Sequence, residues 1–205
     1  QLAGLEKILI ALFASPLIGY VIGYLLLRLI VMLCWNASPR INGLFKRAQV
    51  MTALALALSH GTNDAQKTMG IITLALVTGG YLAEFAVPVW VIVLCAGMIA
   101  AGTALGGWKL IRTLGGKFYK IRPLDGFTSQ LASAAVILSA SVIGGPVSTT
   151  QVVSSTIMGV GAAERVNKVR WGVAKDIAVA WLLTIPATAL VGAGAYWLIT
   201  HLILQ

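Results

Sequence analysis

Charged side chains are scarce in this sequence. Only 10% of its 205 residues are Asp, Glu, Lys or Arg, whereas a soluble domain of this size usually carries about 25%. Hydrophobic residues make up 59% of the chain, and the mean hydropathy is +0.91. A water-soluble fold would lack the polar side chains needed to cover this apolar surface. The composition therefore excludes a soluble globular domain and a disordered chain, and it leaves an integral membrane protein.

Cysteine is also rare, because the sequence holds only two, and this excludes a disulfide scaffold. Cys34 and Cys95 both lie in apolar segments, where we expect small buried hydrophobes without a redox role. No cluster with metal-ligand spacing and no Ser–His–Asp set is evident in the sequence. We therefore predict no resident metal or cofactor, and a membrane enzyme is the weakest of the functional classes.

Acidic residues number six against fifteen Lys and Arg, which gives a formal net charge of +9. Twelve of these fifteen cations fall in three short stretches, residues 40–47, 109–122 and 165–175. Such clustering is typical of cytoplasmic loops under the positive-inside rule and argues against a nucleic-acid surface. The predicted basic loops are residues 36–47, 107–126 and 164–172.

Five apolar segments are long enough to cross or enter a bilayer about 30 Å thick. Two of them are interrupted by polar residues, at HGTNDAQK (60–67) and at GGPVSTT (144–150). The first segment also carries a GxxxG pair, Gly19 and Gly23, and the third carries another, Gly102 and Gly106; such pairs permit close helix contact. The segments are residues 8–35, 48–78, 85–106, 127–163 and 173–200.

The loop charges predict a topology. Basic loops flank residues 127–163 on both sides, so this segment is expected to enter and leave on one face as a re-entrant hairpin. The loop 79–84 has no basic residue and is expected to be extracellular. The prediction is a single all-α membrane domain over residues 1–205, with an extracellular N-terminus, four crossings and one re-entrant hairpin, in the cytoplasmic membrane.

The first interruption places Asp64 and Lys67 inside an apolar region, where a charge costs at least a few kcal/mol. At this spacing the two share a helix face, and either a neutralising salt bridge or a functional role fits. Gly61 permits the backbone to deviate, and Asn63 and Asp64 are favourable N-caps. We therefore expect a broken helix whose second half begins near Asp64 and directs free N–H groups into the membrane.

The second interruption has similar features with different residues. The run Gly144–Pro146 is expected to end one helix, Ser148 to cap the next, and Thr149 and Thr150 to lie in its first turn. Amides and hydroxyls at a helix N-terminus, without an acidic residue, favour an anion. The alternative is a kink whose hydroxyls bond back to carbonyls. Broken helices that meet near the bilayer midplane are typical of secondary-transporter substrate sites.

Two further polar residues lie near the interruptions. Gln130 either lines the cavity or makes an interhelical hydrogen bond. His60 is next to the first interruption, where it either relays protons or is a satisfied structural histidine. The sequence leaves both alternatives open.

Long motifs in both interrupted segments resemble the inorganic phosphate transporter (Pit) family. They are SHGTNDAQKTMG (59–70), PLDGFTSQ (123–130) and GGPVSTTQ (144–151). The likeness extends over nearly the whole chain and matches the C-terminal half of family members. It implies transport of phosphate with protons or sodium, in some bacterial members as a neutral metal–phosphate complex. It also implies one repeat of an inverted-repeat fold, with an N-terminal half as partner; because the chain begins at Gln1, we expect a fragment or a processed product.

The resemblance also implies roles for particular residues. Sodium-type members have an asparagine where this chain has Lys67, and they tend to have a glutamate where it has Gln130. An ammonium could stand where sodium would bind, so proton coupling is predicted, with Asp64, Lys67 and Gln130 as the coupling residues. The residues implied in phosphate binding are Thr62, Asn63, Asp64, Ser148, Thr149 and Thr150.

Two alternatives to phosphate transport remain open. Hydroxyls and amides bind any tetrahedral oxyanion, so sulfate or arsenate could be the substrate. A channel with a re-entrant selectivity loop would repeat that loop around a symmetric pore, but the two interruptions differ in sequence. The predicted partners are inorganic phosphate, a proton rather than sodium, the lipid bilayer and the N-terminal half; a homodimer is left open.

Overall fold

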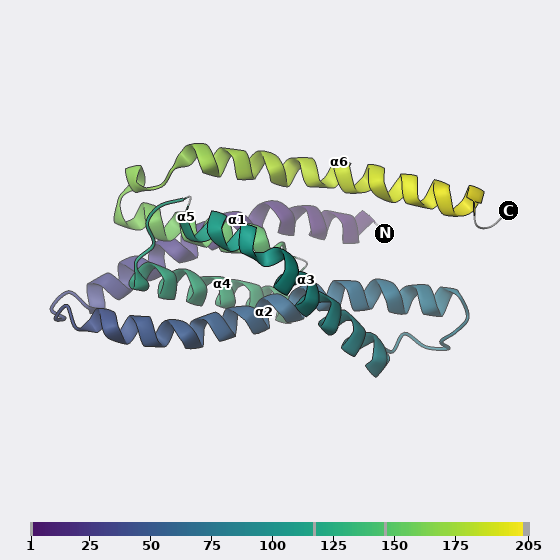
Figure 1. Cartoon of the computed structure of the whole chain (residues 1–205), viewed down its shortest axis with the longest axis horizontal. Helices are drawn as coiled ribbons and strands as arrows, with labels where there is room; N and C mark the ends of the chain where they lie inside the picture. Colours follow the sequence, from purple (N-terminus) through teal and green to yellow (C-terminus); the bar gives the residue numbers. More distant parts are fainter. Residues whose placement is uncertain (1, 117, 146, 203–205) are drawn as a thin grey trace. The chain divides into compact units, whose positions relative to one another are not determined.

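The computed structural model describes residues 2–116, 118–145 and 147–202. These residues form α-helices and one 3-10 turn, with no strand among them (Figure 1), so the all-α prediction is confirmed. The elements are α1 (Leu2–Leu33), α2 (Ile41–Thr78), α3 (Val89–Gly116), α4 (Pro123–Ile143), α5 (Thr149–Glu164), η1 (Val166–Lys168) and α6 (Trp171–Leu202).

Four of the helices are long and apolar enough to cross a membrane, which supports a membrane protein. Helix α5 has 16 residues and is about 24 Å long at 1.5 Å per residue, so it is too short to cross alone. The chain divides into two compact units, Gln1–Val169 and Arg170–Gln205. The second unit contains α6, and everything described below belongs to the first. The candidate spans are Ile10–Leu33, Val89–Trp108, Pro123–Ile143 and Trp171–His201.

Two pairs of helices run parallel in the first unit. Thr52 bonds to Gln130 and Asn63 bonds to Ser141, and both pairs are 78 residues apart, so α2 and α4 run in the same direction. Helix α1 lies in the same way along α5, because Gly19 is beside Val152 and Gly23 is farther along, beside Thr156. Since α4 and α5 form a hairpin, the base of that hairpin lies at the end where α1 ends and α2 begins.

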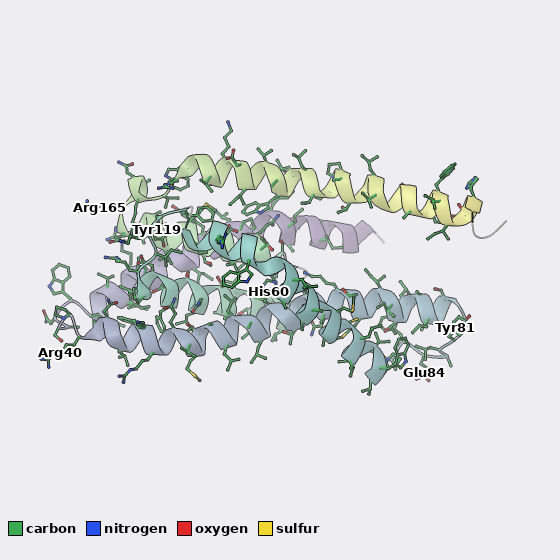
Figure 2. All side chains as sticks on the ribbon, in the orientation of Figure 1. Arg40, His60, Tyr81, Glu84, Tyr119 and Arg165 are labelled. Atoms are coloured by element: carbon green, nitrogen blue, oxygen red, sulfur yellow. The ribbon has the colours of Figure 1, made fainter. Side chains whose placement is uncertain are left out.

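This arrangement places parts of the three predicted basic loops, residues 36–47, 118–126 and 164–169, at one end of the first unit. Arg40, Tyr119 and Arg165 lie there, Tyr81 and Glu84 lie at the opposite end, and His60 lies between (Figure 2). The helices extend into two of these loops, because α2 begins at Ile41 and α3 continues to Gly116. Arg40 and Arg165 thus lie at the same end of the first unit, while the predicted cytoplasmic location of the basic loops stays a prediction.

The predicted interruption at 144–150 is confirmed as a helix end followed by a new helix. Gly144 has φ 72° and ψ 21°, a left-handed conformation that favours glycine, and its N–H bonds back to Ala140 and Ser141. Ser148 occupies the N-cap position of α5 in an extended conformation, but its hydroxyl makes no cap bond. The predicted helix-stopping role of Pro146 lies outside the described residues.

The hairpin tip reaches only part of the way along α2. Lys67 of α2 contacts Val147 at the tip, while α2 continues to Thr78, about 16 Å farther at 1.5 Å per residue. A helical hairpin that turns back beside a longer helix has the geometry that re-entry requires.

The predicted break at residues 60–67 is wrong, because α2 is one continuous helix of 38 residues. The polar side chains in this stretch do not interrupt the helix. The hydroxyls of Ser59 and Thr62 bond back to carbonyls of the preceding turn, which is compatible with helix. Asn63 and Lys67 bond to the hairpin instead. Asp64 therefore lies within a helix and caps none.

The first GxxxG pair forms a close contact, as predicted. A Cβ added at Gly23 would be 2.6 Å from the carbonyl oxygen of Thr156, and one at Gly159 would meet the backbone of Tyr20. A Cβ added at Gly102 or at Gly106 would meet no atom of another element within 4 Å among the described residues. The α1–α5 contact therefore depends on glycine from both helices, while the second GxxxG pair makes no contact within the described chain.

Four charged side chains close the base of the hairpin. Asp125, at the start of α4, is 1% exposed and lies 3.4 Å from both Arg122 and Lys168. Glu164, at the end of α5, pairs with the same two cations, at 2.7 Å from Arg122. The charges of the two cations and the two carboxylates cancel. Their ion pairs join the start of α4 to the end of α5, the two arms of the hairpin. The ring of Tyr119 lies under the Lys168 ammonium at 4.7 Å.

Replacing Tyr119 by phenylalanine is expected to preserve or raise stability, by up to about 1 kcal/mol. The Tyr119 hydroxyl is buried and has no hydrogen-bond partner among the described residues. Burial raises the pKa of Tyr119, and the Asp125 and Glu164 carboxylates raise it further. A raised pKa means that the contribution of Tyr119 to stability is complete below about pH 10, the ordinary tyrosine pKa, and declines above it.

Thermal unfolding of the complete protein in detergent, at pH 8 and pH 10.5, measures this effect. The wild type should lose more stability between the two values than Tyr119→Phe. Tyr81→Phe is the matched control, because Tyr81 is 82% exposed. A Tyr119→Phe variant that is clearly less stable at pH 8 would show that the hydroxyl has a partner.

Candidate functional site

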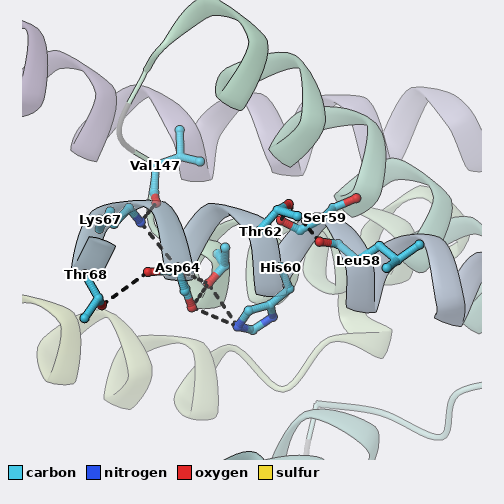
Figure 3. Close-up of polar contacts among 9 residues, drawn as sticks. Leu58, Ser59, His60, Thr62, Asp64, Lys67, Thr68 and Val147 are labelled. Carbon is cyan, nitrogen blue, oxygen red and sulfur yellow. Dashed lines mark hydrogen bonds and ion pairs between the residues drawn. The ribbon is translucent and has the colours of Figure 1, made fainter. Parts of the chain in front are cut away.

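The hairpin tip meets α2 at a cluster of ionisable side chains (Figure 3). His60, Asp64 and Lys67 lie at helical spacings of four and three residues, so one face of α2 presents all three. Thr149 in the first turn of α5 and the backbone of Val147 complete the cluster. The continuous helix α2 therefore places the three ionisable side chains along one face, and the hairpin supplies the Thr149 hydroxyl and the Val147 carbonyl that contact them.

Asp64 is the centre of this cluster. Its carboxylate is 3.1 Å from Nε2 of His60 and 3.5 Å from Nζ of Lys67. The hydroxyl of Thr149 lies 3.3 Å from one carboxylate oxygen and 3.4 Å from the other. The carboxylate of Asp64 is thus contacted by the imidazole of His60 and the ammonium of Lys67 on its own helix, and by the hydroxyl of Thr149 on the hairpin.

Lys67 connects the cluster to the hairpin tip. Its ammonium donates a hydrogen bond of 2.6 Å to the carbonyl oxygen of Val147. The same ammonium pairs with Asp64. Because a charged donor makes a strong hydrogen bond, Lys67 fixes the tip of the hairpin against α2.

A cavity of about 200 Å³ adjoins the cluster between α2 and the end of α4. The lining carries amide, hydroxyl and ammonium groups and no carboxylate, a donor set that suits an anion. A volume of this size accommodates one small oxyanion. The lining residues are Asn63, Gln66, Lys67, Ser141, Gly144 and Gly145.

Asn63 is the most buried polar residue of the lining, at 4% exposed. Its Nδ2 donates to the Ser141 hydroxyl at 3.0 Å. Its Oδ1 is buried and has no partner among the described residues. Since a buried acceptor without a partner costs about 1–3 kcal/mol, this oxygen favours a ligand that carries a donor.

The predicted site residues fall into two groups. Asn63, Asp64, Lys67 and Thr149 meet at the tip, with Ser148 beside them at the start of α5. Thr150 is half-buried in the first turn of α5, and no side-chain bond of its hydroxyl to α2 is recorded among the described residues.

Thr62 and Gln130 lie elsewhere. The Thr62 side chain is exposed, and its hydroxyl bonds to the carbonyls of Leu58 and Ser59. Gln130 accepts a bond of 2.7 Å from Thr52, about 16 Å along α4 from Ser141 at 1.5 Å per residue. The interhelical hydrogen bond is therefore the role that the structure gives Gln130.

Gln66 and Ser141 line the cavity, although neither was predicted as a site residue. Gln66 belongs to the motif HGTNDAQK, and its place in that motif is the sequence feature that could have indicated a role in the site. Ser141 had none, because its place depends on the parallel register of α2 and α4. Among residues 2–116, 118–145 and 147–202, no three His, Cys, Asp or Glu side chains group as metal ligands.

Comparison with known proteins identifies the family. The model of the "Phosphate transporter family" matches residues 34–192. A "Probable low-affinity inorganic phosphate transporter" of Bacillus subtilis is 44% identical over 198 residues, which cover 96% of this chain and 60% of that protein. A protein of the same name from Rhizobium meliloti is 44% identical over 196 residues, or 95% of this chain and 59% of that protein.

A solved structure is also similar. "The sodium-dependent phosphate transporter" matches with a TM-score of 0.71 and 26% identity, over 96% of this chain and 57% of that one. The chain therefore spans about three-fifths of the length of these relatives. The matched family is one of transporters rather than enzymes. On this evidence the chain belongs to the phosphate transporter family.

Proposed function

We propose that the chain forms the C-terminal part of a secondary transporter that moves inorganic phosphate across the cytoplasmic membrane. The observation that carries this proposal is the cavity at the hairpin tip, with Asn63, Lys67 and Ser141 in its wall. Its donor groups suit the oxygens of phosphate. The unpartnered Oδ1 of Asn63 suits a hydroxyl of phosphate, which is protonated in part at neutral pH.

In this proposal the phosphate sits in the cavity between α2 and the end of α4, beside the N-terminus of α5. Ser148 at the N-cap and Thr149 and Thr150 in the first turn of α5 carry hydroxyls and backbone N–H groups, and the positive end of a helix dipole favours an anion. Asn63 lines the cavity from α2, as a side chain within a continuous helix. The site therefore has one helix N-terminus, that of α5.

The remainder of the site belongs to an N-terminal half related by an inverted repeat. The basic end of the first unit, which includes Arg40, Tyr119 and Arg165 (Figure 2), faces the cytoplasm under the positive-inside rule. The α4–α5 hairpin enters and leaves from that side. Residues 1–205 then act as one multi-pass membrane domain.

Protons rather than sodium drive the transport. The Lys67 ammonium binds one oxygen of Asp64 and the carbonyl oxygen of Val147. Carboxylate and carbonyl oxygens are the ligands that hard cations prefer. A permanent cation at this position therefore occupies the oxygens that a sodium ion would use.

Uptake of labelled phosphate by cells that express the complete protein tests the coupling. We expect uptake to persist when choline replaces sodium and to fall about tenfold or more when an ionophore removes the proton gradient, because a coupling free energy of 1–3 kcal/mol corresponds to about 5–150-fold. Strong dependence on sodium would contradict the proposal. Uptake with and without Mg²⁺ separates free phosphate from a metal–phosphate complex.

Competition experiments separate phosphate from other tetrahedral anions. Unlabelled arsenate should compete with phosphate, since it shares the shape and the protonation state. Sulfate carries no proton at neutral pH and cannot donate to Oδ1 of Asn63, so it should compete poorly. Equal competition by sulfate would show that the cavity selects any oxyanion.

A further inference from the structure

His60 forms a closed set of contacts with groups from two helices. Its Nε2 is 3.1 Å from Oδ2 of Asp64 and 3.3 Å from the hydroxyl of Thr149. That hydroxyl is itself 3.3 Å from Oδ2 of Asp64. The imidazole thus touches both the central carboxylate on α2 and the first residue of the hairpin's second arm.

The charged groups that face His60 are few. On α2 they are Asp64 and Lys67. Helix α5 contributes Thr149, and its single charged residue, Glu164, lies at the base of the hairpin, as does Asp125 of α4. No hydrogen bond or ion pair joins α3 to this cluster among the residues that the structure describes.

The charge of the cluster therefore depends on His60. With a neutral imidazole, Asp64 and Lys67 cancel each other. With an imidazolium, the cluster of one carboxylate and two cations carries a net charge of +1. Lys67 belongs both to this cluster and to the cavity wall. His60 lies about 10 Å along α2 from Lys67 at 1.5 Å per residue, so the added charge acts on the cavity across the Asp64–Lys67 pair.

We propose that His60 takes up the coupling proton and thereby makes the cavity at the hairpin tip electrostatically favourable for phosphate. This inference rests on the proposed phosphate transport and names the group that couples it to protons. The proton binds a ring nitrogen of His60, and its loss returns the cluster to neutrality and weakens the hold on the anion. Binding of the proton and of phosphate is then mutually reinforcing, as linkage requires.

Thr149 connects the His60–Asp64 pair to the hairpin. Its hydroxyl contacts both His60 and Asp64, and it is the first residue of α5. When protonation changes the hydrogen bonds of the His60–Asp64 pair, the hydrogen bonds of Thr149 at the hairpin tip change as well. Thr149 acts as a positioning residue in this inference.

The test is the apparent affinity of the complete protein for phosphate in uptake assays at pH 6 and pH 8, with His60→Gln compared to the wild type. At pH 6 the affinity of His60→Gln should be about 5–50-fold weaker than that of the wild type, within the range usual for coupled sites. Between the two pH values the affinity of the variant should change much less. Phosphate itself titrates equally in both proteins, so the difference between them isolates His60.

Three further variants and one control keep the test decisive. His60→Lys supplies a permanent positive charge, so it should hold the low-pH affinity at both pH values while net proton-driven accumulation is lost and phosphate exchange persists. Thr149→Val should weaken the pH dependence, and Thr149→Ser should restore it. His201→Gln is the matched control, because His201 is the second histidine of the chain and lies in α6; it should behave as the wild type.

The outcomes distinguish this inference from the proposed function. Wild-type pH dependence in membrane-inserted His60→Gln or His60→Lys would overturn the role of His60, while phosphate transport would stand. If His60→Gln does not insert, the His60→Lys and Thr149 variants decide in the same way. A wild-type protein that takes up phosphate without any proton dependence would instead overturn the proposed coupling.

Discussion

Replacement of Asp64 by asparagine is expected to abolish coupled phosphate uptake while the protein still inserts in the membrane. Asparagine has almost the same shape, but it removes the negative charge that His60, Lys67 and Thr149 share. Loss of hydrogen bonds to a charged group costs about 1.5–3 kcal/mol each. Two such losses correspond to a decrease of about 100-fold or more in uptake at 1.4 kcal/mol per tenfold.

Initial rates of labelled phosphate uptake, normalised to the amount of protein in the membrane, measure this effect. Asp176→Asn is the matched control, because Asp176 is an exposed carboxylate near the start of α6. Its uptake should equal that of the wild type. Undiminished uptake by Asp64→Asn would show that the central carboxylate has no role in transport.

Replacement of Gly159 by alanine is expected to destabilise the first unit severely, by about 3 kcal/mol or more, since overpacking of a tight contact costs 1–3 kcal/mol even where side chains can adjust. The added methyl group would meet the backbone of Tyr20 on α1. Backbone atoms within a helix cannot move aside as a side chain can. The parallel contact of α1 and α5 must then open, and with it the support of the hairpin.

The yield of monodisperse protein in detergent and its unfolding temperature test this expectation. Gly43→Ala is the control, since Gly43 has no atom within 4 Å of an added Cβ. An alanine in an exposed helix is favoured over glycine by about 1 kcal/mol, so Gly43→Ala should be neutral or stabilising. Equal stability of Gly159→Ala and the wild type would mean that α1 and α5 are not in close contact.

The sequence was sufficient to predict an all-α chain and the helix end near residue 144. Apolar length defines the helices, and the glycine at position 144 ends α4 where a left-handed residue is required. The loop charges predict that the basic loops share one side of the membrane, and this stays a prediction. The parallel register of α2 with α4 is compatible with it, because it brings the start of α4 beside the start of α2.

The continuity of α2 could not be predicted from its own residues. Gly61, Asn63 and Asp64 are helix breakers or caps when they have no tertiary partners. Here the partners are on the hairpin, at Ser141 and Thr149, and tertiary contacts override local propensity. The same reason explains Gln130, whose partner, Thr52, is set by the register of two helices rather than by the motif.

The most direct test of the phosphate site is an experimental structure of the complete protein with arsenate, whose arsenic atom scatters anomalously. We expect an anomalous peak in the cavity, within hydrogen-bond reach of Asn63, Lys67 and Ser141. A peak near the base of the hairpin, around Arg122 and Lys168, would contradict it. So would an empty cavity in crystals that hold arsenate at another place in the protein.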